Sequence, residues 1–177
     1  INKKTLNENL EKKEIDNYKK GDIKKQKNKV DKCEYIILEG ICKSFLINPE
    51  GNEITLSFFK NKSVISPYTT RIKKGVSILN FKALTDLKIV KINAHLFEKL
   101  IIENIEVRDF ANSVLRNELV MKINKEIGFA SLTAKERLNE FREQFIELEN
   151  LIPHTDIATY LGITNVSLSR LRRELLK

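Results

Sequence analysis

The chain has 177 residues, enough for one domain or two small domains with a buried core. Hydrophobic residues make up 41% and charged residues 32%, so the chain is too apolar to be a disordered polyelectrolyte. A formal net charge of +8 favours anionic partners such as nucleic acid or acidic lipid without identifying either. No apolar run approaches the roughly 20 residues that span a bilayer, and no signal-peptide pattern opens the chain. We therefore expect a soluble, cytoplasmic protein with no membrane partner.

The N-terminal half carries short runs of β-forming residues. After a lysine-rich start, these runs are separated by turn signals such as Asn48-Pro49-Glu50-Gly51. The runs that we predict as strands are Tyr35–Leu38, Ile41–Ile47, Ile54–Phe59 and Leu87–Ile92. In the third run, apolar residues alternate with Thr55 and Ser57, the period-2 pattern of a strand with one buried face. The pattern predicts an antiparallel barrel or roll between about residues 15 and 93.

Helical periodicity follows the predicted roll. From Ala94 to Ile127 the chain has neither proline nor glycine, and apolar residues recur every three or four positions. These residues form two stripes, the first of Val107, Phe110, Val114 and Met121, the second of Leu115, Leu119, Ile123 and Ile127. Because two apolar stripes need two partners, we expect a long helix that packs against the roll on one side and against a symmetry mate on the other. Gly128 and the segment Ser131–Thr133 are interpreted as a hinge.

A second domain is predicted after this hinge. Thr133, with Glu136 three residues later, forms a capping-box pattern that begins a helix. Apolar residues then recur at helical spacing as far as about Glu149, and Pro153 ends the helix.

The segment His154–Leu171 matches a helix-turn-helix position by position. It places the small Ala158 where the two helices touch, and Gly162 four residues later where the chain turns. Thr164 suits the N-cap of the second helix. The apolar residues at the helix crossing are Ile157, Leu161, Ile163, Leu168 and Leu171. The positions that point outward lie on one helical face, which would enter the major groove of DNA: Asn165, Val166, Ser169, Arg170 and Arg173.

Two kinds of DNA contact are expected from this segment. Arg170 is the candidate for reading a base edge, because a guanidinium forms two hydrogen bonds with guanine O6 and N7, and Asn165 can pair with adenine. The candidates for phosphate contacts, which position the protein without specifying a sequence, are Ser167, Ser169, Arg172, Arg173 and Lys177. The alternative interpretation is an ordinary helix pair whose basic C-terminal end interacts with the helix dipole.

A β-roll, a long helix and a C-terminal helix-turn-helix together resemble the Crp/Fnr family of bacterial transcription regulators, over about Ile15 to Lys177. Lys20-Gly21-Asp22, Tyr35–Gly40 and Pro49-Glu50-Gly51 fall where the family has its turn glycines and its Tyr-x-x-x-x-Gly strand. Arg170 falls on the family's base-reading arginine, whereas Val166 stands where many members carry glutamate.

The resemblance implies an α+β fold in three parts. These are a β-roll sensor-like domain over residues 1–103, a dimerisation helix and hinge over 104–130, and a helix-turn-helix DNA-binding domain over 131–177. It implies a homodimer joined through the long helix, double-stranded DNA as the ligand and RNA polymerase as a further partner. An effector, where one exists, would bind between the roll and the long helix and change the angle of the hinge.

One stretch departs from the cyclic-nucleotide-binding members of that family. Where those members carry the arginine that holds the cyclic phosphate, this chain has Ser77, so a buried phosphate would lack a paired guanidinium. We therefore expect a regulator that does not respond to cyclic AMP and whose effector is unknown. The candidates for holding some other effector are Tyr68, Thr69, Arg71 and Lys73.

No constellation of catalytic residues is present, so we predict that the protein is not an enzyme. A metal enzyme built on a β-roll needs clustered histidines, and His95 and His154 are far apart in the sequence. We predict no metal site and no cofactor, while Cys33, Cys42 and His95 leave a haem as an open alternative. The alternative function is a stand-alone β-roll module that binds a small ligand or a protein, without DNA binding.

Overall fold

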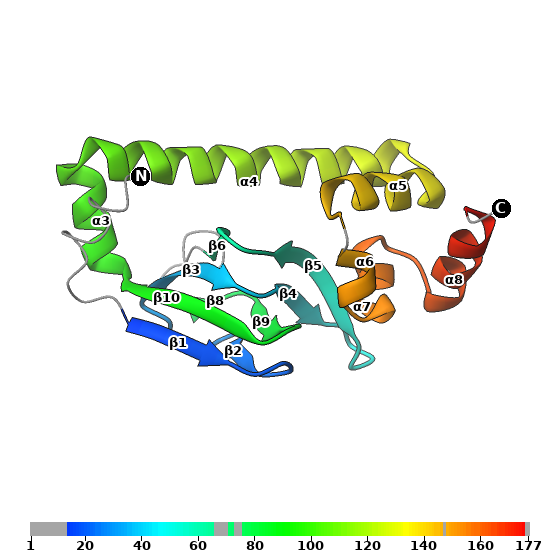
Figure 1. Cartoon of the computed structure of the whole chain (residues 1–177), viewed down its shortest axis with the longest axis horizontal. Helices are drawn as coiled ribbons and strands as arrows, with labels where there is room; N and C mark the ends of the chain where they lie inside the picture. The colour runs from blue at the N-terminus through cyan, green and yellow to red at the C-terminus, as the bar shows by residue number, and fades with distance from the viewer. Residues whose placement is uncertain (1–13, 66–70, 73–75, 147, 176–177) are drawn as a thin grey trace.

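The computed structural model describes residues 14–65, 71–72, 76–146 and 148–175. Within these residues, strands come first and helices follow, and the long helix α4 lies across the strands (Figure 1). The strands are β1 (Glu14–Tyr18), β2 (Ile23–Lys25), β3 (Cys33–Glu39), β4 (Cys42–Ile47), β5 (Glu53–Phe59), β6 (Val64–Ile65), β7 (Arg71–Ile72), β8 (Val76–Ser77), β9 (Asn80–Ala83) and β10 (Leu87–Asn93). The helices are α3 (Ala94–Glu103), α4 (Ile105–Ser131), α5 (Ala134–Gln144), α6 (Leu148–Leu151), α7 (His154–Tyr160) and α8 (Asn165–Glu174).

The strands form two antiparallel four-stranded sheets and one short hairpin. The first sheet has the order β1-β10-β3-β6, the second has the order β2-β9-β4-β5, and β7 pairs with β8. The apolar residues that alternate along the strands fill the space between the sheets, where Ile37, Ile89 and Phe81 have no exposed surface. The predicted α+β fold with an antiparallel β-roll is confirmed.

The long helical stretch after the roll is two helices, not one. Asn104 separates α3 from α4, and its side-chain oxygen accepts hydrogen bonds from the backbone N–H groups of Glu106 (2.9 Å) and Val107 (3.1 Å). Asparagine is a strong N-cap because its side chain satisfies amide groups that lack a partner at a helix start. The helical periodicity that starts at Ala94 is therefore divided between α3 and α4.

The C-terminal end of α4 also differs from the expectation. Gly128 lies inside the helix, which continues to Ser131, so Gly128 is not a break in the chain. The helix ends where Leu132 adopts an extended conformation, and Thr133 then begins α5. Thr133 and Glu136 form the predicted capping box, with the Glu136 carboxylate accepting from the Thr133 N–H at 2.8 Å.

The helix that begins at Thr133 is shorter than predicted. It ends at Gln144, because Phe145 leaves the helical conformation and its N–H bonds to the Phe141 carbonyl at 2.8 Å. The short helix α6 then leads to α7. The turn places Phe145 in the core, which explains why the apolar spacing continued past the true end of the helix.

The roll and the C-terminal helices share one hydrophobic cluster. The ring of Phe58 in β5 lies 6.0 Å from that of Phe141, 5.8 Å from that of Phe145 and 5.1 Å from that of Tyr160. Ile41 and Leu84 are the other roll residues in the cluster. Its buried helical members are Leu138, Phe141, Phe145, Leu148, Ile152, Ile157, Ala158, Leu161 and Leu168. The division of the chain after residues 103 and 130 stays a prediction, and this cluster joins the first part to the third.

Candidate nucleic-acid interface

The helix-turn-helix is built from α7, a tight turn and α8, as predicted. Thr164 caps α8, because its hydroxyl accepts a hydrogen bond from the Ser167 N–H at 3.1 Å. Gly162 makes the turn with a φ of +68°, in the left-handed region that favours glycine. A Cβ on Gly162 would lie 2.7 Å from the Phe129 ring of α4, so the long helix approaches this turn closely.

The packing inside the motif follows the sequence pattern. Ala158 and Ile157 in α7 are buried, and Leu168 is the buried residue of α8. Ile163 and Leu171 are partly buried against the same cluster. These contacts leave one side of α8 for solvent.

The side of α8 that faces solvent carries the predicted reading residues. We define the α8 outer face as the exposed residues Asn165, Val166, Ser169, Arg170 and Arg173. Val166 is 69% exposed, a large value for an apolar side chain with no packing role. Among the described residues, Arg170 and Arg173 have no carboxylate partner. In Figure 1, α8 lies at the end of the molecule opposite α3.

The other predicted phosphate contacts have different surroundings. The Ser167 hydroxyl is partly buried and lies 3.0 Å from the Thr164 hydroxyl at the helix cap. Arg172 is paired within the protein, with its Nε 2.6 Å from Oε1 of Glu149. Lys177 lies outside the described residues.

A buried group of charges joins α7 to the roll. Lys43 in β4 is 1% exposed, and its Nζ lies 2.6 Å from Oδ1 of Asp156 and 2.5 Å from Oε2 of Glu53. Lys82 adds a second pair with Glu53 at 3.0 Å, and the two lysines hold the pKa of that carboxyl below its usual range despite its partial burial. The charges therefore fix one edge of the helix-turn-helix against the second sheet.

The two apolar stripes of α4 lie in different surroundings. Val107 is buried against β10 and α3, and Phe110 and Val114 are partly buried, as expected of the stripe that faces the roll. Met121 from the same stripe is 47% exposed, so the stripe is packed over its first part and not at its end. The second stripe, Leu115, Leu119, Ile123 and Ile127, is exposed along its whole length.

A cavity of about 560 Å³ lies between β5, α4 and α7. Its walls include Leu56, Phe59 and Leu79 of the roll, and its charged lining residues in α4 include Glu118 and Lys125. Oε2 of Glu118 is buried without a hydrogen-bond partner among the described residues, and burial raises the pKa of this carboxyl.

Lys125 connects three parts of the structure at this cavity. Its Nζ donates to the Leu56 carbonyl of β5 at 2.8 Å and lies 3.8 Å from the centre of the Tyr160 ring of α7. Burial lowers the pKa of Lys125 to about 8 and raises that of Tyr160 to about 12.

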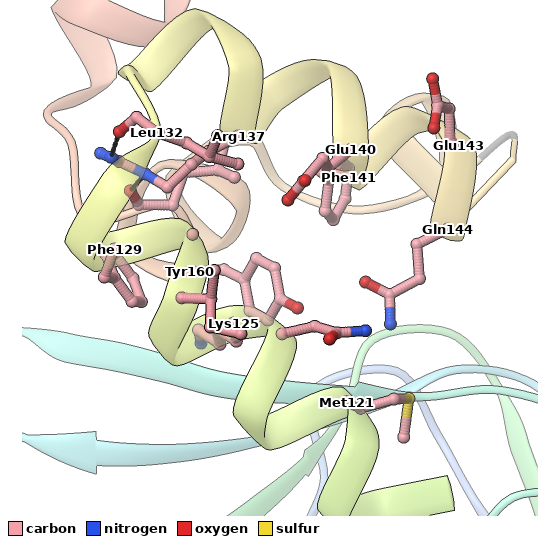
Figure 2. Close-up of a pocket in the computed structure, with 14 residues that line it drawn as sticks. Met121, Lys125, Phe129, Leu132, Arg137, Glu140, Phe141, Glu143, Gln144 and Tyr160 are labelled. Atoms are coloured by element: carbon pink, nitrogen blue, oxygen red, sulfur yellow. Dashed lines mark hydrogen bonds between the residues drawn. The ribbon is translucent and has the colours of Figure 1, made fainter.

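A second cavity, of about 660 Å³, lies on the α5 side of the same lysine (Figure 2). Figure 2 shows Lys125 and Tyr160 lying together in this pocket, with Arg137 of α5 beside Leu132. Arg137 donates to the carbonyls of Leu132 (2.7 Å) and Leu161 (3.1 Å), so it ties the end of α4 to the turn of the helix-turn-helix.

The predicted effector residues are described only in part. Tyr68, Thr69 and Lys73 lie outside the described residues, and Arg71 begins β7, whose backbone pairs with Ser77 of β8. Ser77 is buried, and its hydroxyl donates to the Leu79 carbonyl at 2.7 Å.

Sequence reasoning missed Glu118 and Lys125 as cavity residues. They fall four residues after Val114 and four after Met121, so they continue the inward stripe with charged side chains. A charged residue at a position where the apolar stripe predicts a hydrophobic one was the signal that could have revealed them.

Among the described residues, no three His, Cys, Asp or Glu side chains gather where they could hold a metal ion. Cys42 lies in the roll core, where burial raises the pKa of its thiol to about 12 and disfavours the thiolate that binds haem iron. His95 is exposed at the start of α3. Within the described ranges, none of the helices has the length and apolar character that crossing a membrane requires.

Solved structures share this architecture of a β-roll, a long helix and a C-terminal helix-turn-helix. FixK2 from Bradyrhizobium japonicum matches with a TM-score of 0.77 and 19% identity over 92% of this chain and 84% of that one. A CooA mutant from Carboxydothermus hydrogenoformans matches with a TM-score of 0.78 and 20% identity over 97% of this chain and 82% of that one. A Crp/Fnr-family protein from Eubacterium rectale matches with a TM-score of 0.72 and 17% identity over 99% and 84%.

The chain therefore has a Crp/Fnr-like fold. No protein-family model and no curated protein matches its sequence.

Proposed function

We propose that the chain is a homodimeric, sequence-specific DNA-binding transcription regulator of the Crp/Fnr type. The observation that carries this proposal is the α8 outer face, which is polar and basic, exposed and held on a packed helix-turn-helix. The face combines two arginines that have no carboxylate partner among the described residues with Asn165, whose amide can pair with a base edge.

The roles of the individual residues follow from their chemistry. Arg170, without a carboxylate partner among the described residues, is proposed to read a guanine, and Asn165 an adenine. Val166 is suited to an apolar contact with a thymine methyl group. The proposed phosphate contacts are Ser167, Ser169, Arg173 and Lys177.

The exposed stripe on α4 is proposed as the dimer interface. Leu115, Leu119, Ile123 and Ile127 repeat every four residues and are 46%, 58%, 44% and 55% exposed. An apolar stripe of this kind on a 27-residue helix is stable in water when a second helix covers it. A dimer would also present two α8 outer faces to successive major grooves, about 34 Å apart.

The effector remains unidentified, and we propose the cavity between β5 and α4 as its site. Ser77 is engaged with a backbone carbonyl and supplies no cation for a cyclic phosphate, which supports a regulator that does not respond to cyclic AMP. RNA polymerase as a partner, a cytoplasmic location and the lack of enzymatic activity belong to the same proposal.

Selection of bound sequences from random duplex DNA tests the proposal. A regulator enriches a sequence with two related half-sites, and its affinity for that sequence falls steeply between about 50 and 200 mM salt. A stand-alone ligand-binding or protein-interaction module enriches nothing, and that result would refute the proposal.

A further inference from the structure

Three charged side chains and a histidine, from four helices, meet behind α8. Arg142 comes from α5, Glu149 from α6, His154 from α7 and Arg172 from α8. The group therefore links the DNA-facing helix to each of the other helices in the C-terminal part.

Glu149 is at the centre of this group. Its Oε2 lies 2.6 Å from Nε of Arg142, its Oε1 lies 3.1 Å from Nη2 of Arg142, and the same Oε1 lies 2.6 Å from Nε of Arg172. Arg142 uses both arms of its guanidinium fork, so its contact with Glu149 is directional, whereas Arg172 meets the same carboxylate through Nε as a close ion pair. Glu149 is 12% exposed, so water competes weakly for these bonds, and Arg142 holds the pKa of its carboxyl below the usual range.

Arg172 has a second contact, with His154 at the exposed start of α7. Its Nη1 lies 2.7 Å from Nε2 and 3.0 Å from Nδ1 of the His154 ring at the start of α7. The guanidinium is therefore held between α6 and α7, and it is 30% exposed. Arg170 and Arg173 on the same helix are exposed, without a carboxylate partner among the described residues.

Apart from the turn and the Thr164 cap at its start, α8 is held mainly by apolar contacts. Leu168 is its buried residue, and Leu171 and Leu175 are partly buried in the same cluster. A row of leucines resists separation of two helices, but it permits rotation and sliding more readily than a guanidinium held by Glu149 at Nε and by His154 at Nη1 does. The contact of Arg172 with Glu149 is thus suited to set the rotation of the helix about its axis.

We propose that Glu149 is the residue that positions the DNA-reading helix, and that Arg172 supplies this positioning contact instead of a phosphate contact. The inference rests on the proposed function. A two-hydrogen-bond contact between an arginine and a guanine tolerates little displacement, so the rotation of α8 determines how well Arg170 discriminates between bases.

The test uses the full-length chain, the selected duplex and a scrambled duplex of the same length. Two quantities are measured for each variant: the ratio of the two affinities, and the slope of log affinity against log salt for the selected duplex. The variants are Glu149→Gln, Arg172→Lys, Arg172→Met and Arg173→Met, each checked for folding by circular dichroism and titrated for its active fraction. Glu174→Gln is the control, because it removes the same charge from the exposed C-terminal end of α8.

The proposal makes different predictions for these variants. Glu149→Gln and Arg172→Lys lower the affinity ratio about tenfold, because α8 loses its orientation, and neither changes the salt slope beyond the control. Arg172→Met likewise lowers the ratio and keeps the slope. Arg173→Met reduces the magnitude of the slope by about 0.9, the value for one lost phosphate contact.

Three results would overturn the inference. A slope reduced by about 0.9 in Arg172→Met would show that Arg172 contacts a phosphate. Tighter binding by Glu149→Gln than by Glu174→Gln would show that Glu149 masks Arg172 from DNA. An unchanged affinity ratio in Glu149→Gln and Arg172→Lys would show that the ion pair only stabilises the fold. Failure of the wild-type chain to bind any duplex would instead refute the proposed function.

Discussion

Lys43 of β4 and Asp156 of α7 form a buried ion pair, with 2.6 Å between Nζ and Oδ1 although the two residues are 113 positions apart in the chain. The pair lies at the contact between the roll and the helix-turn-helix, where Glu53 also contacts the lysine. It ties the two parts together in addition to the apolar cluster beside it.

Removal of the lysine is expected to be strongly destabilising. Lys43→Met leaves two carboxylates near a buried site without their cation, so the free energy of unfolding falls by about 3–5 kcal/mol. Urea denaturation measures the loss. The double variant Lys43→Met/Asp156→Leu removes both charges and recovers a large part of it. Lys19→Met is the control, because Lys19 pairs with Asp86 at the exposed surface, and an equal loss there would contradict the argument.

Gly162→Ala tests the tight turn of the helix-turn-helix. Alanine in the left-handed backbone conformation of residue 162 costs about 1 kcal/mol. Its Cβ would also lie 2.7 Å from the Phe129 ring, which is too close. Gly51→Ala is a matched control, because Gly51 has a φ of +84° with open space around it. We expect a larger fall in unfolding free energy for Gly162→Ala, measured in urea, and equal falls would show that the ring moves aside without cost.

Lys125 should make stability depend on pH. Its pKa is about 8 in the folded chain and is 10.5 without burial, so the unfolded chain binds more protons between these values. Stability attributable to this residue therefore rises with pH across that window, by about 2 kcal/mol between pH 7 and pH 9.5. The measurement compares wild type with Lys125→Met in urea at both pH values, which cancels the titration of Cys42 and the tyrosines. A constant difference between the two proteins would contradict the buried charge.

The α4 stripe makes a prediction about assembly. Leu119→Lys places a charge in the middle of the exposed apolar stripe, where a partner helix would have to bury it. We expect the dimer to dissociate in sedimentation experiments at micromolar concentration, with circular dichroism unchanged. Asn117→Lys adds the same charge at an exposed position outside the stripe and should leave the dimer intact. A dimer that survives both substitutions would place the interface elsewhere.

Arg170→Ala should reduce DNA affinity and specificity together. Loss of a two-hydrogen-bond base contact costs about 1–3 kcal/mol on the selected duplex and relaxes the preference at one base pair. Fluorescence anisotropy with a set of single-base variants of the duplex measures both effects. Unchanged affinity and unchanged base preference would show that Arg170 does not contact a base.

The helix-turn-helix could be predicted in detail because its signals are local. Ala158, Gly162 and Thr164 each satisfy a backbone or packing requirement within a few residues, and all three have the predicted roles. The strands were found for the same reason, since alternation in Ile54–Phe59 depends only on which face is buried.

The errors arose where one local signal competed with another. Gly128 was expected in a hinge but lies inside α4, and Phe145 keeps the helical spacing of apolar residues although α5 ends at Gln144. The burial of Lys43 was not predictable, because a lysine in a strand normally faces solvent and its partner Asp156 belongs to a distant segment. Glu118 and Lys125 were missed because the cavity that they line forms only when β5 and α4 come together.

The cluster in which Phe58 packs against Phe141 and Tyr160 limits how this protein can be divided. If residues 131–177 were excised, they would lose the β5 surface that completes their core. A segment of that size buries little apolar surface, so this loss would destabilise it. A chimera that transplants the helix-turn-helix segment onto another β-roll should therefore include the face formed by β4 and β5. The two parts are better regarded as one cooperative folding unit than as exchangeable modules.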